Sequence, residues 1–94
     1  MVDYAPCEHD HLQVVWDAIV AQQFGEAIRR LRKKRGMSQE ALAHEVGISK
    51  NHMQLIEAGR GSSRSDGPIS NPRMTTVYGL ADALDVTASD LLPR

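Results

Sequence analysis

The stretch that most constrains the fold of this chain is residues 38–59, whose pattern predicts two short helices joined by a sharp turn. Ser38 is a good N-cap for the first helix, and the apolar residues that follow recur at the spacing of one helical face. Gly47 then adopts positive φ without steric cost, and a second helix is predicted over residues 50–58. With so few residues between them, the two helices must cross steeply.

The second helix of this stretch has two different faces. A rotation of about 100° per residue places one set of residues on the same side: Lys50, Asn51, Gln54, Leu55 and Ala58. Met53 and Ile56 lie on the opposite side and are expected to be buried. The polar face suits the edges of DNA bases, because lysine prefers guanine, asparagine and glutamine pair with adenine, and an apolar side chain packs on a thymine methyl group. We therefore expect Lys50, Asn51, Gln54 and Leu55 to read bases.

Three linked segments carry a family resemblance: FGEAIRRLRKKRGMSQEALAHEVGIS, IEAG and NPRMTTVYGLADALDVTASDLL. Together they resemble the Cro and phage-repressor class of helix-turn-helix proteins, also called the XRE class. The resemblance covers Phe24 to Leu92 apart from one insertion, and it implies an all-α, five-helix, lambda-repressor-like DNA-binding domain. This chain adds an N-terminal amphipathic helix, so we expect an extension at residues 1–22 and the helix-turn-helix domain at residues 23–94.

The N-terminal extension is predicted to contain a helix that begins after Asp10. Its apolar positions follow the pattern of an amphipathic helix: Leu12, Val15, Trp16, Ile19 and Val20. This face either folds back onto the domain as extra core or pairs with a second subunit, because a small domain rarely leaves such a stripe exposed. This helix either runs into the next one or is separated from it by a break or kink, which Gly25 favours. The next helix ends at the αL residue Gly36.

The C-terminal part is predicted to form two more helices. Pro72 suits the first turn of the fourth helix, and Asp85 tolerates the αL conformation after that helix. Thr87 can cap a short last helix over residues 88–92. In many relatives this end forms the dimer contact, so its two leucines belong either to the core or to an interface: Leu91 and Leu92.

Residues 60–70 depart from the family. In the family only a couple of residues usually separate the glycine of the IEAG segment from the Asn-Pro pair that begins the next segment. Glycine, proline and four serines predict a flexible surface loop. Arg60 and Arg64 are expected either to grip backbone phosphates or to belong to a tolerated insertion without a role.

The resemblance also implies positioning roles. Arg32 is expected to form an ion pair with Glu57. Gln39 is expected to touch a phosphate and to brace the start of the helix over residues 50–58, which we call the reading helix. The set expected to contact phosphate or position the helix is Gln39, Ser49, His52, Arg60, Arg64 and Arg73. The basic run of residues 29–35 is either a solvated face or a source of one or two further phosphate contacts.

The charge distribution fits DNA binding although the net charge is only -1. Residues 1–25 carry a net charge of -4, residues 26–64 carry +5, and residues 65–94 carry -2. The positive charge therefore surrounds the predicted reading helix.

Other functional classes have little support in the sequence. Cys7, His9 and His11 form a C-x-H-x-H string, but no fourth ligand has zinc-site spacing, so we expect no metal and no cofactor. No catalytic constellation is visible, and we expect neither an enzyme nor a small-molecule substrate. The single cysteine, the acidic N-terminus and the lack of a membrane-length apolar run favour a cytoplasmic protein without a membrane segment.

The sequence thus favours a transcriptional regulator that binds double-stranded DNA as a dimer on a palindromic operator. The alternative is an interaction module, such as an antitoxin or adaptor, that uses the Trp16 helix to hold a protein partner.

Overall fold

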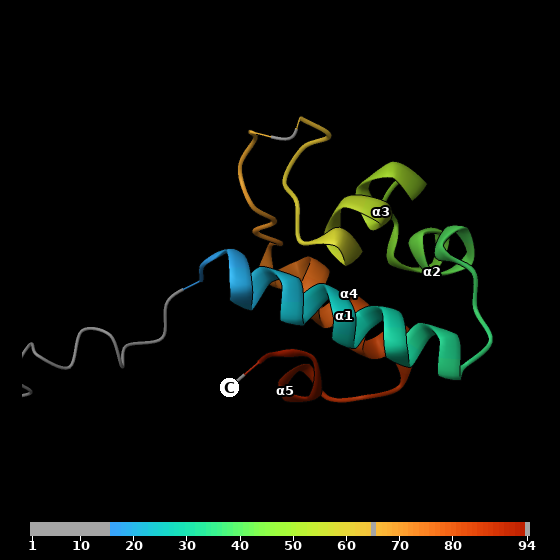
Figure 1. Cartoon of the computed structure of the whole chain (residues 1–94). Helices are drawn as coiled ribbons and strands as arrows, with labels where there is room; N and C mark the ends of the chain where they lie inside the picture. Colours follow the sequence, from blue (N-terminus) through green and yellow to red (C-terminus); the bar gives the residue numbers. More distant parts are fainter. Residues whose placement is uncertain (1–15, 65, 94) are drawn as a thin grey trace, which may run out of the picture.

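The computed structural model describes residues 16–64 and 66–93, and these residues form five helices and no β-strand. The helices are α1 (Ala18–Lys34), α2 (Gln39–Val46), α3 (Lys50–Ala58), α4 (Met74–Leu84) and α5 (Ala88–Leu91), as Figure 1 shows. The prediction of an all-α, five-helix domain is confirmed. Within the described ranges, no helix is both long enough and apolar enough to cross a membrane.

All five helices contribute to one hydrophobic core. α1 packs against α3, α4 and α5, while α2 packs against α3 and α4. The largest fully buried side chains are Phe24, Ile28, Leu42, Met53, Ile56, Leu80 and Leu91. Ile48, in the turn before α3, packs against this core but is only partly buried. Each fully buried apolar side chain contributes about 1.5–3 kcal/mol, so a chain this short needs an apolar face on every helix.

The turn between α2 and α3 has the predicted chemistry. The Ser38 hydroxyl accepts a hydrogen bond from the Ala41 amide at 2.9 Å and caps α2. Gly47 ends that helix in the αL conformation, with φ 87°. The Ser49 hydroxyl accepts from the His52 amide at 3.0 Å and caps α3. These local bonds fix where the reading helix begins.

The N-terminal helix differs from the prediction. α1 begins at Ala18, because the Asp17 carboxylate caps it by accepting a hydrogen bond from the Val20 amide at 3.0 Å. Trp16 and Asp17 therefore precede the helix, and residues 10–15 of the predicted helix lie outside the described residues. The break expected at Gly25 was wrong, since α1 is continuous across that residue.

Gly25 instead lies at a close contact between the backbones of α1 and α3. A Cβ atom at this position would lie 2.4 Å from the carbonyl oxygen of Ile56 and 2.5 Å from that of Glu57. Glycine costs a helix about 1 kcal/mol relative to alanine, but only a hydrogen atom fits between these backbones. The glycine that predicted a break is therefore a packing residue.

Trp16 folds back onto its own domain. Its ring meets Phe24 edge to face, with centroids 5.5 Å apart, and its indole Nε1 donates a hydrogen bond to the carbonyl oxygen of Ser70. The sequence left open whether the apolar stripe folds back onto the domain or pairs with a second subunit. Trp16 folds back and packs, partly buried, against the core.

The C-terminal half follows the prediction except at the start of α4. Pro72 does not lie in the first turn, because Arg73 keeps an extended conformation (φ -71°, ψ 155°) as the N-cap and the helix begins after it. Asp85 ends α4 in the αL conformation with φ 59°, as expected. Thr87 and Asp90 form a capping box at α5. Leu91 belongs to the core, whereas Leu92 is 36% exposed.

Two contacts join the arms of the insertion, which the structure describes at residues 60–64 and 66–70. Arg60 and Ile69 form an antiparallel bridge, and the Gly61 amide donates to the Pro68 carbonyl at 2.7 Å. The two arms are therefore paired at their base. Figure 1 shows the insertion projecting from the side of α1 that also carries α3.

Candidate nucleic-acid interface

The outward face of α3 carries the residues that the sequence assigns to base reading. Lys50, Asn51 and Gln54 are exposed, and Leu55 is partly buried. On the opposite face, Met53 and Ile56 are 0% and 1% exposed. The predicted separation into a buried apolar face and an outward polar face is confirmed, and three polar side chains of α3 are exposed on the outward face.

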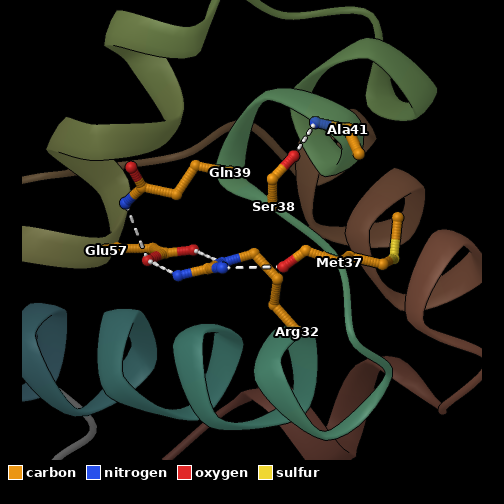
Figure 2. Close-up of polar contacts among 6 residues, drawn as sticks. All are labelled: Arg32, Met37, Ser38, Gln39, Ala41 and Glu57. Atoms are coloured by element: carbon orange, nitrogen blue, oxygen red, sulfur yellow. Dashed lines mark hydrogen bonds and ion pairs between the residues drawn. The ribbon is translucent and has the colours of Figure 1, made fainter.

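A buried ion pair joins α1 to α3, as the family resemblance implied. Arg32 Nε lies 2.6 Å from Glu57 Oε2, and Arg32 Nη2 lies 3.0 Å from Glu57 Oε1. A third donor of the same guanidinium, Nη1, reaches the Met37 carbonyl oxygen at 2.8 Å (Figure 2). The two side chains are only 9% and 4% exposed. Because Glu57 accepts a two-pronged bond, this pair fixes the orientation of α3 as well as its position.

Gln39 supports the same cluster but at a different place from the one expected. Its amide Nε2 donates to Glu57 Oε1 at 2.9 Å, so it braces the last turn of α3 and not the start (Figure 2). The steep crossing of α2 and α3 brings the first residue of α2 over the end of α3. Gln39 remains only partly buried, and its amide oxygen has no bond partner among the described residues.

An open polar hollow of about 470 Å³ lies where α1 meets the beginnings of α2 and α3. Its lining has three basic residues, one acidic residue and two neutral polar ones: Arg29, Arg32, Lys50, Glu40, Ser38 and Gln39. From the basic run of residues 29–35, only Arg29 and Arg32 reach this hollow. The sequence did not indicate that Arg29 lies near Lys50, because that proximity depends on the angle between α1 and α3.

The other residues predicted to contact phosphate lie around α3 and the insertion. The hydroxyl oxygen of Ser49 accepts the capping bond and keeps its own hydrogen for a further acceptor, and His52 is exposed in the first turn of α3. Arg60 is exposed, and its Nη2 donates to the Ser63 carbonyl at 2.9 Å. Two more predicted residues lie further out: Arg64, in an exposed ion pair with Asp66 at 3.2 Å, and Arg73, exposed at the start of α4.

No group of three or more potential metal ligands gathers anywhere in residues 16–64 or 66–93. The C-x-H-x-H string of Cys7, His9 and His11 lies outside the described residues.

A family model described as a helix-turn-helix domain matches residues 23–92 of this chain. The chain is also similar to the uncharacterized HTH-type transcriptional regulator y4dJ of Sinorhizobium fredii. The two are 32% identical over 68 residues, which make up 72% of this chain and 77% of y4dJ.

Two solved structures show the same arrangement of helices. The restriction-modification controller protein C.AhdI from Aeromonas hydrophila is 29% identical with a TM-score of 0.65, and the match covers 77% of this chain and 96% of that protein. The biofilm master regulator SinR, solved in complex with DNA, is 26% identical with a TM-score of 0.57, and the match covers 72% and 95%.

Proposed function

This chain belongs to the helix-turn-helix domain family, in its Cro and phage-repressor class, and we propose that it is a sequence-specific regulator that reads double-stranded DNA with α3. One observation carries the proposal. α3 is held from behind by the buried Met53 and Ile56 and by the ion pair between Arg32 and Glu57, while its polar face is left open. A rigid helix with outward hydrogen-bonding side chains is what direct readout in the major groove requires.

The base-reading residues in this proposal are the exposed Lys50, Asn51 and Gln54, together with the partly buried Leu55. Each good contact with a base edge is worth about 1–3 kcal/mol of discrimination against the wrong base. Lys50 and Asn51 lie in the first turn of α3, which is the end of a recognition helix that enters the groove most deeply.

Phosphate contacts would supply most of the affinity. We assign them to residues on both sides of α3. Arg29 lies near the start of α2, His52 lies in the first turn of α3, and Arg60 opens the insertion. The remaining predicted positioning residues are Gln39, Ser49, Arg64 and Arg73. Such contacts fix the register of the protein on the duplex and do not select its sequence.

A homodimer completes the proposal, with the two reading helices about 34 Å apart on a palindromic operator. An apolar groove of about 320 Å³ offers the dimer contact. Trp16 and Val20 line one side of it, and Leu92 lines another. Residues from both the N-terminal and the C-terminal part of the described chain line this groove, and we propose that its exposed apolar surface is the dimer contact. The exposed Met74 adds to the same apolar surface.

The same groove supports a second candidate function. An interaction module such as an antitoxin or adaptor would use it to hold a different protein, with DNA binding secondary or lost. In either case the role proposed is non-catalytic, without a cofactor or small-molecule substrate, and located in the cytoplasm.

Selection of bound duplexes from a random pool, followed by fluorescence anisotropy titration at several salt concentrations, separates the two functions. The regulator binds a selected site with nanomolar affinity that falls steeply as salt rises, because each phosphate contact releases counterions. Micromolar binding without sequence preference, and with little dependence on salt, supports the interaction module instead.

A further inference from the structure

A hollow of about 300 Å³ separates α3 from the insertion. Its residues come from three segments: His52 and Leu55 of α3, Arg60, Pro68 and Ile69 of the insertion, and Asn71 just beyond it. Leu55 belongs both to this hollow and to the proposed reading face. The hollow is therefore continuous with the surface that we propose enters the major groove.

The wall formed by the insertion is held in place by backbone contacts. The antiparallel bridge between Arg60 and Ile69 and the Gly61 to Pro68 hydrogen bond join its two arms. At the base, the Ser70 amide donates to the Gly59 carbonyl at 3.1 Å, and Gly59 is the C-cap of α3. A Cβ atom at Gly61 would lie 2.6 Å from the Ile69 carbonyl oxygen, so the arms touch closely there. The wall is thus tied directly to the end of the reading helix.

The lining has the chemistry of a site for an anion attached to an apolar ring. Arg60, His52 and Asn71 bring hydrogen-bond donors, and Leu55, Pro68 and Ile69 bring apolar surface. No aspartate or glutamate is among the lining residues, although the chain contains 12 of them. A deoxyribose-phosphate unit offers both features, since its sugar has an apolar face and its phosphate carries one negative charge.

We propose that this hollow holds the sugar-phosphate backbone of one DNA strand, bracketed between α3 and the insertion. The inference deepens the proposed function and rests on it. A helix that lies in the major groove is flanked by phosphates, and contacts to them set the register of the protein on the duplex. Here the insertion adds a second wall, so the strand is contacted from two sides. The insertion is then a DNA-binding element and not a tolerated extra loop.

The test uses the full chain and the operator duplex obtained by random-pool selection. Each backbone phosphate is replaced in turn by a neutral methylphosphonate, and affinity is measured for the wild type and for Asn71→Asp. That substitution is nearly isosteric, and it places a negative charge in the hollow. Ser89→Asp is the matched control, because it adds the same charge on α5, away from α3 and the insertion in Figure 1.

The expected result has two parts. Asn71→Asp binds the unmodified operator about tenfold more weakly than the wild type, whereas Ser89→Asp binds within about twofold of it. One methylphosphonate position per half-site weakens the wild type about fivefold but leaves Asn71→Asp unchanged or strengthens it, because the repulsion with that phosphate is gone. Thermal unfolding of both variants checks that the fold is intact.

Two results would overturn the inference. The first is an Asn71→Asp variant that binds the unmodified operator like the wild type, or whose loss of affinity with methylphosphonate matches that of the wild type at every position. The second is saturable binding of free 2′-deoxyadenosine 5′-monophosphate below about 1 mM that Asn71→Asp abolishes, together with a flat methylphosphonate scan; the hollow would then be a small-nucleotide site. A wild-type chain that selects no operator overturns the proposed function itself, which distinguishes the two failures.

Discussion

The guanidinium of Arg32 donates to both carboxylate oxygens of Glu57, at 2.6 and 3.0 Å. This contact joins α1 to α3 through two residues that lie 25 positions apart in the chain. Both side chains are buried, and Glu57 accepts a third hydrogen bond from Gln39. The first helix thereby holds the reading helix near its C-terminal end, while Met53 and Ile56 hold it along its length.

Removing one partner of this pair should destabilise the fold strongly. We expect Glu57→Gln to lower the free energy of unfolding by about 3–5 kcal/mol, because the guanidinium of Arg32 would keep its charge in a buried place without a counterion. Urea unfolding measures the change. Asp66→Asn is the control: it breaks the exposed pair with Arg64, whose side chain is 78% exposed, and it should change stability by about 0.5 kcal/mol or less. A loss below about 1 kcal/mol for Glu57→Gln would contradict this account.

Gly25→Ala should destabilise the fold although alanine is the better helix former. The added methyl group would meet two backbone carbonyls of α3 at 2.4 and 2.5 Å, and it must push α3 away from α1. We expect a loss of about 1–3 kcal/mol in urea unfolding, together with weaker DNA binding as the reading helix shifts. Gln23→Ala, at an exposed position of the same helix, is the matched control and should be nearly neutral. A more stable Gly25→Ala variant would show that the two backbones are not in contact.

A charge in the apolar groove should weaken self-association. Met74 is 59% exposed in the single chain and lines the groove that we assign to the dimer contact. Because an unpaired ammonium group is costly to bury, Met74→Lys should raise the dimer dissociation constant about tenfold or more in sedimentation velocity. Thr75→Lys adds the same charge at the next, exposed residue and should leave the dimer intact. If both variants dimerise like the wild type, the contact lies elsewhere.

The capping box of α5 predicts a small dependence of stability on pH. Hydrogen bonds from the backbone amide and then the side chain of Thr87 hold the pKa of Asp90 below its ordinary value of 3.8. A carboxylate with a lowered folded-state pKa stabilises the fold above its unfolded-state pKa, and this contribution disappears as the pH falls through the folded-state value. The stability difference between the wild type and Asp90→Ala should therefore be constant from about pH 7 to 5 and shrink below about pH 4. Thermal unfolding across this range measures it, and a difference that stays constant down to pH 2 would contradict the assignment.

The sequence predicted those parts of the fold that local chemistry decides. Ser38, Ser49, Gly47 and Asp85 each adopt the predicted cap or αL conformation, because these depend on a few neighbouring residues. The helical period of α3 correctly separated the buried Met53 from the exposed Lys50. The Arg32 to Glu57 pair followed only from the family resemblance, since no local pattern links the two residues.

The features that were missed depend on how distant segments meet. Gly25 predicted a break, because a sequence does not show that another backbone passes over the helix at that residue. The bond between Trp16 and Ser70, and the bond from Gln39 to the end of α3, likewise depend on tertiary crossings. The hollow beside α3 arises because the two arms of the insertion pair with each other. The composition of the insertion predicts only a loop.

The central claim is that the outward face of α3 selects a DNA sequence, and parallel random-pool selection with the wild type, Lys50→Ala, Asn51→Ala and Arg60→Ala tests it most directly. The account predicts a palindromic site for the wild type, with half-sites one helical turn apart. It further predicts that Lys50→Ala and Asn51→Ala lose preference at separate, symmetry-related positions, and that Arg60→Ala keeps the same site with uniformly weaker binding. Selection of an unchanged site by both α3 variants, or of no site by the wild type, would contradict the claim.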